Sequence, residues 1–278
     1  MAVAPVPDGL AAADERSHPP GDDPAWGESW SFWWWTPDAA LGGYVRIGFL
    51  PHLGACWYWA ALAGAGRPTV LVVDQEVPPP RRPTLEVRHH GLWADHTVEV
   101  PFDHVTLGCE AFALGLDDPH DAWRRPLLGD RLPFGLDLEW ETDGPAVVGP
   151  AGGEWGGYDL PCLVHGEVLV ADERIEVDAT GSRRHAWGVE RWWDAEWMRL
   201  SGRLDDGSWC GVEAELGHDL QVPRRPMASA PVLVEAPDGR AARLDRVLCR
   251  FTDPATGLAG AGWMEANDPP AAASPTRP

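Results

Sequence analysis

The chain contains no lysine, and all 22 of its basic residues are arginine. They are outnumbered by 43 acidic residues, which gives a formal net charge of −21 at pH 7. Nucleic-acid phosphates and anionic membrane surfaces repel so acidic a chain, so neither is expected as a partner. No apolar run reaches the roughly 20 residues that span a bilayer. The first 24 residues lack the basic start and apolar stretch of a signal peptide. We therefore expect a cytoplasmic protein with no membrane insertion.

Several chemical motifs are also missing. The five cysteines stand singly with no Cys-x-x-Cys pair, which is typical of buried free thiols in a reducing compartment. Glycine-rich nucleotide loops, the Gly-x-Ser-x-Gly elbow and the His-Glu-x-x-His motif are absent. His89, His90, His96 and His104 lie close in the sequence, but His89 and His90 are adjacent and point to opposite faces of a strand. No metal and no organic cofactor are predicted.

Helical periodicity is nearly absent, and short β-patterned runs take its place. They follow one another at hairpin spacing and are separated by turn signals such as Asp205-Asp-Gly207 and Asp238-Gly239. Regular meanders of this length close into barrels or sandwiches, because open sheet edges are a liability. An all-β protein built from two successive antiparallel units is therefore predicted. Barrels of about eight strands can hold one small apolar ligand.

Composition divides the chain into five parts. Residues 1–27 and 268–278 are rich in Ala, Pro, Asp and Gly without periodicity, so both are predicted to be disordered tails. The Gly- and Pro-rich stretch 144–157 is predicted to be a linker. It separates an N-terminal β module, residues 28–143, from a C-terminal β module, residues 158–267.

Tryptophan is abundant, with 17 residues against three tyrosines. So much indole indicates either a very aromatic core or an apolar ligand cavity lined with rings. The candidate ligand-contacting residues are Trp57, Trp59, Trp93, Trp192, Trp193, Trp197 and Trp209.

The segment 182–194 carries the candidate chemistry. On a strand, His185 and Trp187 share one face. In an acid-initiated reaction, His185 or a neighbouring carboxylic acid, Glu190 or Asp194, would protonate an alkene. Indole faces would stabilise the resulting cation by about 2 kcal/mol or more each when desolvated. The alternative is that these are ordinary core histidine and tryptophan side chains.

Two parts of the sequence resemble a known superfamily. The second half carries Pro161–Val170, Asp172–Asp178 and Gly181-x-x-x-His-Ala-Trp-Gly188. The first half adds Trp30, Gly42-Gly43-Tyr44, Trp57-Tyr-Trp59 and Trp93-Ala-Asp-His96. Together they resemble the carotenoid hydratases (hydroxyneurosporene synthase) and the AttH-like proteins, including uncharacterised actinobacterial two-module relatives.

The resemblance implies a pair of consecutive lipocalin-like antiparallel β-barrels, or strongly curved sandwiches, with a ligand site near the module interface. The superfamily includes hydratases that add water across an isoprenoid double bond, and Diels–Alderases that fold a polyene in the cavity. In the hydratases a His-x-Trp pair is implicated in catalysis, and it matches His185 and Trp187.

The functional expectation is a protein that binds a hydrophobic small molecule, isoprenoid, steroid or polyketide-like, in an aromatic-lined cavity. It would act on this molecule by hydration, isomerisation or cyclisation. The alternative is a non-catalytic lipid or isoprenoid carrier. The His-x-Trp-Gly motif favours the enzyme. Arg184, where an acidic residue is common, and the lack of any tyrosine after Tyr158 favour the carrier. The sequence leaves the oligomeric state open.

Overall fold

The structure is a computed structural model that describes residues 6–80, 84–149, 155–215, 222 and 224–269. These residues form strands and three short 3-10 helices, η1 (Ala12–Glu15), η2 (Pro51–Leu53) and η3 (Pro119–Trp123). In this described part of the chain, no helix has the length and apolar character needed to cross a membrane. The prediction of a nearly all-β protein is confirmed.

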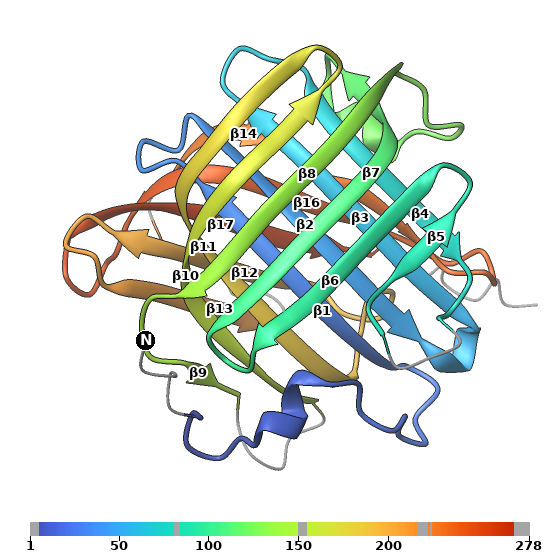
Figure 1. Cartoon of the computed structure of the whole chain (residues 1–278), viewed down its shortest axis with the longest axis horizontal. Helices are drawn as coiled ribbons and strands as arrows, with labels where there is room; N and C mark the ends of the chain where they lie inside the picture. The colour runs from blue at the N-terminus through green and yellow to red at the C-terminus, as the bar shows by residue number, and fades with distance from the viewer. Residues whose placement is uncertain (1–5, 81–83, 150–154, 216–221, 223, 270–278) are drawn as a thin grey trace, which may run out of the picture.

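The larger sheet closes into a barrel (Figure 1). Its strands are β1 (Trp26–Trp35), β2 (Leu41–Leu50), β3 (Ala55–Gly64), β4 (Thr69–Val77), β5 (Val87–His89), β6 (Leu92–Val100), β7 (His104–Leu116), β8 (Asp130–Thr142), β9 (Val147–Val148), β10 (Trp155–Val170) and β11 (Glu173–Val189). Antiparallel pairing runs in the order β4-β3-β2-β1-β11-β10-β8-β7, and β4 then pairs with β7 to complete the ring. This ring of hydrogen bonds leaves no open edge between these eight strands.

The second sheet packs against one side of the barrel and is open. Its strands are β12 (Trp197–Leu204), β13 (Trp209–Glu215), β14 (Arg224–Ser229), β15 (Val232–Glu235), β16 (Ala241–Thr252) and β17 (Ala259–Asp268). They pair in the order β13-β12-β17-β16-β14, and β15 also pairs with β16. In Figure 1 these orange and red strands lie behind β1, β2 and β3.

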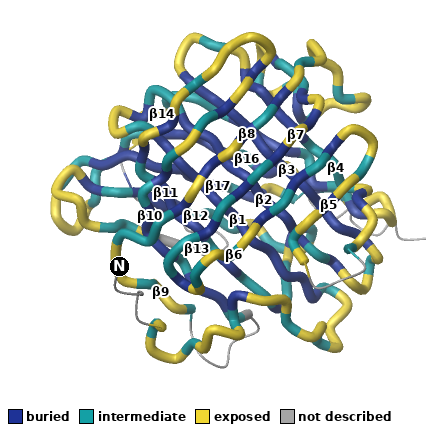
Figure 2. The backbone as a smooth tube through the Cα atoms, viewed as in Figure 1, coloured by how far each residue is buried: buried dark blue, intermediate teal, exposed yellow. Residues whose placement is uncertain are grey.

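Two apolar cores follow from the alternation of side chains along the barrel strands. One face of each barrel strand fills the barrel interior with a continuous cluster of buried side chains, including Trp30, Phe32 and Trp140. The opposite face of β1–β4 packs against the second sheet, where Trp33, Trp57 and other rings form an interlayer core. Figure 2 shows the result, with buried segments running across the molecule, exposed loops at its rim, and exposed residues alternating with buried ones along β7 and β8.

Strand β1 is buried along its whole length, because it borders both cores. Its carbonyl oxygens also accept hydrogen bonds from both sides. The Trp140 indole donates to the Trp33 carbonyl at 3.2 Å from the barrel interior, and the Trp263 indole donates to the Trp34 carbonyl at 3.0 Å from the second sheet. Strand β1 therefore joins the two layers.

The sheets divide the chain at a different place from the predicted modules. Strands β10 and β11, which begin inside the predicted linker at residue 155 and run to residue 189, belong to the barrel, where β11 pairs with β1 and β10 pairs with β8. Within the predicted linker, β9 pairs with β10. The chain therefore passes from the barrel to the second sheet between β11 and β12. The two-domain division itself stays a prediction.

The N-terminal segment also differs from expectation. Residues 6–25, predicted to be part of a disordered tail, lie across one end of the barrel (Figure 1, dark blue). Glu15 of η1 is buried and forms an ion pair with buried Arg183 of β11. The sequence of this segment has no motif or periodicity that predicts the ion pair between Glu15 and Arg183. Most of the predicted tail 268–278 lies outside the described residues.

Removal of one interlayer ring should destabilise both sheets together. Trp59 is fully buried between the layers, so Trp59→Ala should lower the free energy of unfolding by about 3–5 kcal/mol. Urea unfolding followed by circular dichroism should remain one transition. Leu128→Ala, at an exposed position, should change stability by less than about 0.5 kcal/mol. Two separated transitions, with only one moved by Trp59→Ala, would contradict the shared core.

Candidate functional site

A pocket of about 470 Å³ lies between the barrel wall and the second sheet. Its barrel side comes from the outward faces of β1, β2 and β11, and its other side comes from the 190–197 connection and from β12 and β17. The lining residues are Ser29, Ser31, Arg46, Arg184, Ala186, Trp187, Gly188, Val189, Glu190, Arg191, Trp192, Asp194, Ala195, Glu196, Trp197, Arg199 and Glu265. The pocket thus combines indole rings with charged groups of both signs.

Glu190 is held in place by three hydrogen-bond donors. The Trp192 indole donates to it at 2.6 Å, Arg46 at 3.1 Å and the Ser29 hydroxyl at 3.4 Å. The Arg46 guanidinium also lies 4.9 Å from the centre of the Trp192 ring. All three donors point at the carboxylate, so Glu190 acts as a hydrogen-bond acceptor in the pocket.

Glu265 on β17 is the buried counter-charge of the pocket. It accepts hydrogen bonds from Arg246 at 2.7 Å and from Arg199 at 2.8 Å. Burial alone would raise the pKa of Glu265, but Arg246, Arg199 and Arg46 outweigh it and hold the pKa below its ordinary value. This carboxylate is therefore charged at neutral pH and fixes two of the arginines.

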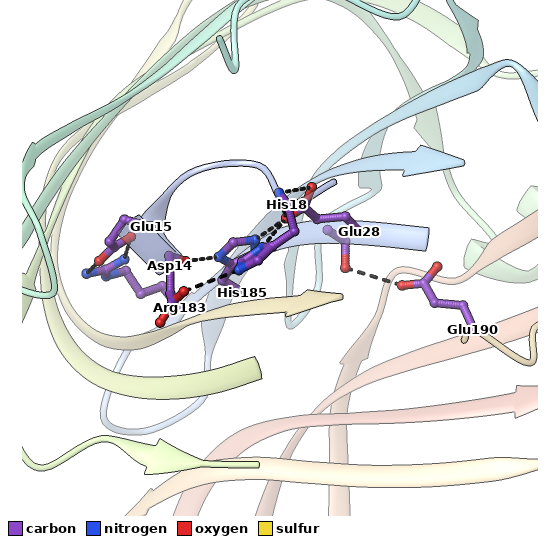
Figure 3. Close-up of polar contacts among 8 residues, drawn as sticks. Asp14, Glu15, His18, Glu28, Arg183, His185 and Glu190 are labelled. Carbon is purple, nitrogen blue, oxygen red and sulfur yellow. Dashed lines mark hydrogen bonds and ion pairs between the residues drawn. The ribbon is translucent and has the colours of Figure 1, made fainter. Parts of the chain in front are cut away.

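His185 does not line this pocket. Its side chain faces the barrel interior, where its Nδ1 lies 2.7 Å from the Asp14 carbonyl oxygen and its Nε2 lies 3.0 Å from Glu28 Oε1. His18 approaches the same oxygen with its Nδ1 at 2.8 Å. Figure 3 shows these side chains converging, with Glu190 set apart and directed elsewhere.

The ring planes of the two histidines are fixed by tryptophans. His185 stacks on Trp30 with ring centres 4.2 Å apart, and His18 stacks on Trp187 at 3.8 Å. Gly156 makes room for Trp187, since a Cβ there would lie 2.6 Å from the indole nitrogen. The His-x-Trp pair is thus part of a packed cluster under the N-terminal segment.

Burial and pairing shift the pKa values of this cluster in different directions. Burial lowers the pKa of His185 below its ordinary value, despite the nearby Glu28. Burial also opposes the charged form of His18, but hydrogen bonds to Glu28 and Asp14 raise its pKa. Burial alone would raise the pKa of Glu28, yet hydrogen bonds from both histidines bring it below its usual value.

The predicted site residues fall into three groups. Five line the interlayer pocket: Trp187, Glu190, Trp192, Asp194 and Trp197. Three more pack in the interlayer core beside Trp192: Trp57, Trp59 and Trp193. The others lie elsewhere: His185 in the buried cluster, Trp209 against Trp35, and Trp93 on β6. The catalytic and substrate-binding roles of all of them stay predictions.

Sequence reasoning missed the partners of His185. Glu28 had a signal, because it precedes Trp30 by two residues and therefore shares its inward face. His18 had none, because it belongs to a segment without periodicity. Arg46 and Glu265 were missed because their partners, Glu190 for Arg46 and the cross-strand neighbours Arg199 and Arg246 for Glu265, are set by tertiary pairing that the sequence does not show.

Comparison with known proteins places the chain among relatives of the same fold. Residues 11–208 match the family described as "Domain of unknown function (DUF7064)". The chain belongs to this family. The match begins in the docked N-terminal segment and continues through the barrel to the end of β12, so it includes His18, Glu28 and His185. No curated protein matches the chain.

Solved structures share the architecture of this DUF7064 chain. An AttH-like protein from Nitrosomonas europaea is 16% identical, with a TM-score of 0.54, covering 95% of this chain and 98% of its own. Kievitone hydratase from Nectria haematococca is 11% identical, with a TM-score of 0.50, covering 88% of this chain and 90% of its own. At such low identity these likenesses show a shared fold. They bear out the likeness to AttH-like proteins and the lipocalin-like fold class.

The ion pairs that Glu265 of β17 makes with Arg199 and Arg246 should make the free energy of unfolding depend on pH. The folded pKa of Glu265 lies below its ordinary value of 4.5, so its contribution is present above that value and is lost as pH falls through the folded pKa. Glu265→Gln should lower the free energy of unfolding by about 3–5 kcal/mol at pH 7, because buried arginine charge loses its partner.

The difference between Glu265→Gln and the wild type should narrow as the pH falls from 4.5 toward the lower folded pKa of Glu265, because the unfolded chain takes up the proton first. Glu173→Gln serves as the control, since Glu173 pairs with Arg67 at an exposed position, and it should cost less than about 1 kcal/mol. Urea unfolding at a series of pH values measures both. A Glu265→Gln effect that stays constant from pH 7 to acid would refute the ion-pair explanation.

Proposed function

We propose that this protein binds a small molecule with an apolar, ring-rich or polyene body and one polar group in the interlayer pocket. Isoprenoid, steroid and polyketide-like molecules have this character. The observation that carries the proposal is a pocket of about 470 Å³ between two sheets, lined by the rings of Trp192 and Trp197 together with fixed ion pairs. Small-molecule sites are typically clefts of roughly 300–1,000 Å³ with apolar walls and a few placed polar groups.

The tryptophans supply the apolar contact. Trp192 is buried against Trp57 and Trp59, with ring centres 6.0 Å from each, so its orientation is fixed by the core behind it. Trp197 is partly exposed and lies 5.6 Å from Trp192. A flat or extended apolar ligand gains contact with such rings at little cost in side-chain freedom, because they are already packed.

The ion pairs supply orientation. Arg46 with Glu190, and Arg199 with Glu265, place charged hydrogen-bonding groups on the barrel side and the sheet side of the same pocket. These groups hold one another, so their positions do not depend on a ligand. A hydroxyl, carbonyl or carboxylate of the bound molecule would meet donors and acceptors already in place.

Binding without turnover is the version that we propose. An acid-initiated reaction needs a proton donor in contact with the ligand. His185, the predicted donor, faces the barrel interior beneath the N-terminal segment, and Glu190 accepts three hydrogen bonds in the pocket. Hydration, isomerisation or cyclisation would require a donor in the pocket other than these two.

The test fills the pocket and leaves the core intact. Ala186 lines the pocket from the outward face of β11 and is partly exposed, so Ala186→Phe should occupy ligand space. Protein produced in its own host, analysed by native mass spectrometry and solvent extraction, should carry an apolar small molecule. Its occupancy should fall at least about tenfold in Ala186→Phe, equivalent to about 1.4 kcal/mol of lost binding.

Trp93→Phe is the matched control, because Trp93 lies on β6, away from the pocket lining, and it should retain the molecule. Equal occupancy in Ala186→Phe and the wild type would refute binding in this pocket. Release of a chemically altered molecule after incubation with the wild type, but not with Ala186→Phe, would replace the binding function with catalysis.

A further inference from the structure

We propose that His18, Glu28 and His185 form a binding site for a divalent transition-metal cation of the Zn²⁺ type. The site would join the N-terminal segment to strands β1 and β11 of the barrel. It is separate from the interlayer pocket, and its existence does not depend on what the pocket binds.

The three candidate ligand atoms converge on one point. His18 Nδ1 lies 2.8 Å from Glu28 Oε1, and His185 Nε2 lies 3.0 Å from the same oxygen. All three candidate ligand atoms lie within 4.8 Å of one another. Ligands of a tetrahedral zinc ion, each about 2.0–2.2 Å from the metal, are separated by roughly 3.3 Å. Small adjustments would therefore bring these atoms to ligand spacing.

The hydrogen-bond donors and acceptors around His185 also favour a cation at this point. The Asp14 carbonyl can only accept, so His185 Nδ1 donates its proton there at 2.7 Å. The 3.0 Å contact between Nε2 and Glu28 Oε1 then needs a positive charge between the two atoms, either a second proton or a metal cation. A metal cation supplies that charge and uses both lone pairs.

Each candidate histidine ligand also has a hydrogen-bond partner for its second ring nitrogen. Metal-binding histidines usually donate their second ring N–H to a carbonyl or carboxylate, which fixes the tautomer. Asp14 provides both kinds of support: its carbonyl accepts from His185 Nδ1, and its carboxylate lies 3.4 Å from His18 Nε2. The backbone N–H of His18 donates to the Glu28 carboxylate at 2.9 Å. Stacking on Trp30 and Trp187 fixes the ring planes.

The ligand set indicates the class of metal. Two imidazoles and one carboxylate suit Zn²⁺ and similar transition metals, whereas Mg²⁺ and Ca²⁺ prefer oxygen ligands. The His18 side chain keeps 20% of its surface exposed, while Glu28 and His185 are buried. A metal could therefore enter from the solvent side, with water completing its coordination.

A second histidine–carboxylate group on the surface offers an internal control. His104, Glu139 and Glu141 also bring ligand atoms within 4.8 Å of one another, but both glutamates are exposed. Within the described residues, no tryptophan ring stacks on His104, and neither carboxylate of this group is buried. A chain of net charge −21 attracts cations weakly everywhere. This surface group measures that background.

The experiment uses chelator-treated full-length protein titrated with ZnCl₂ against a chromophoric competitor. We expect one tight equivalent in the wild type and in His104→Gln. In His18→Gln the Kd for Zn²⁺ should rise at least about 100-fold, because a direct ligand is lost. Loss of a residue that only hydrogen-bonds to a ligand typically costs about 10–100-fold in metal affinity. MgCl₂ at the same concentration should not compete. His185→Gln is the second ligand variant, and His18→Gln decides if His185→Gln does not fold.

A structural readout accompanies the titration. Arg16 is exposed and lies two residues before His18, so trypsin cleavage after Arg16 reports whether the segment is docked. Zn²⁺ should slow that cleavage in the wild type and in His104→Gln, but not in His18→Gln. Equal Zn²⁺ affinity in His18→Gln and the wild type, or no binding above the His104-dependent background, would overturn the proposal and leave the cluster held by protons.

Discussion

The whole structure depends on the burial of strand β1 on both faces. Trp30, Phe32 and Trp34 fill the barrel interior, while Trp33 and Trp35 pack against the second sheet. Such a strand reads as a continuous aromatic run because neither face meets water. It can exist only where a closed barrel covers one face and another layer covers the other, so the sequence of β1 requires both layers.

The same strand separates the two candidate sites. Toward its N-terminal end, Glu28 points inward to the two histidines, and Ser29, the next residue, points outward to Glu190 in the interlayer pocket. Side chains one residue apart on a strand face opposite ways. The proposed metal site at the barrel end and the interlayer pocket are therefore kept apart by one backbone, and Trp187 is the residue that borders both.

The N-terminal segment completes the barrel end. Glu15 accepts hydrogen bonds from both terminal nitrogens of Arg183, at 2.7 and 2.9 Å, and also from the backbone N–H of Phe102. These contacts hold η1 against the barrel and thereby place Asp14 and His18 on either side of His185 and Glu28. Removal of one partner from so buried a pair is costly, so the ion pair fixes the position of the segment.

The sequence was sufficient for the fold class and for part of the site. Alternation and turn signals predicted the strands, and the segment 182–194 contains Trp187, Glu190, Trp192 and Asp194 of the pocket lining. The sequence did not show that β10 and β11 complete the barrel, because the pairing partners of a strand are set by long-range packing. It also did not show the docking of Glu15 and His18, since two ion-pairing side chains in an aperiodic segment leave no pattern.

In this proposal a small molecule occupies the interlayer pocket, while side chains fill the barrel interior. A crystal structure of the protein isolated with its bound molecule tests this most directly. We expect ligand density between β1 and β12, in contact with Trp192 and Trp197. The inward rings of Trp30 and Phe32 should keep their positions. Density inside the barrel, reached by displacement of those rings or of the N-terminal segment, would contradict it.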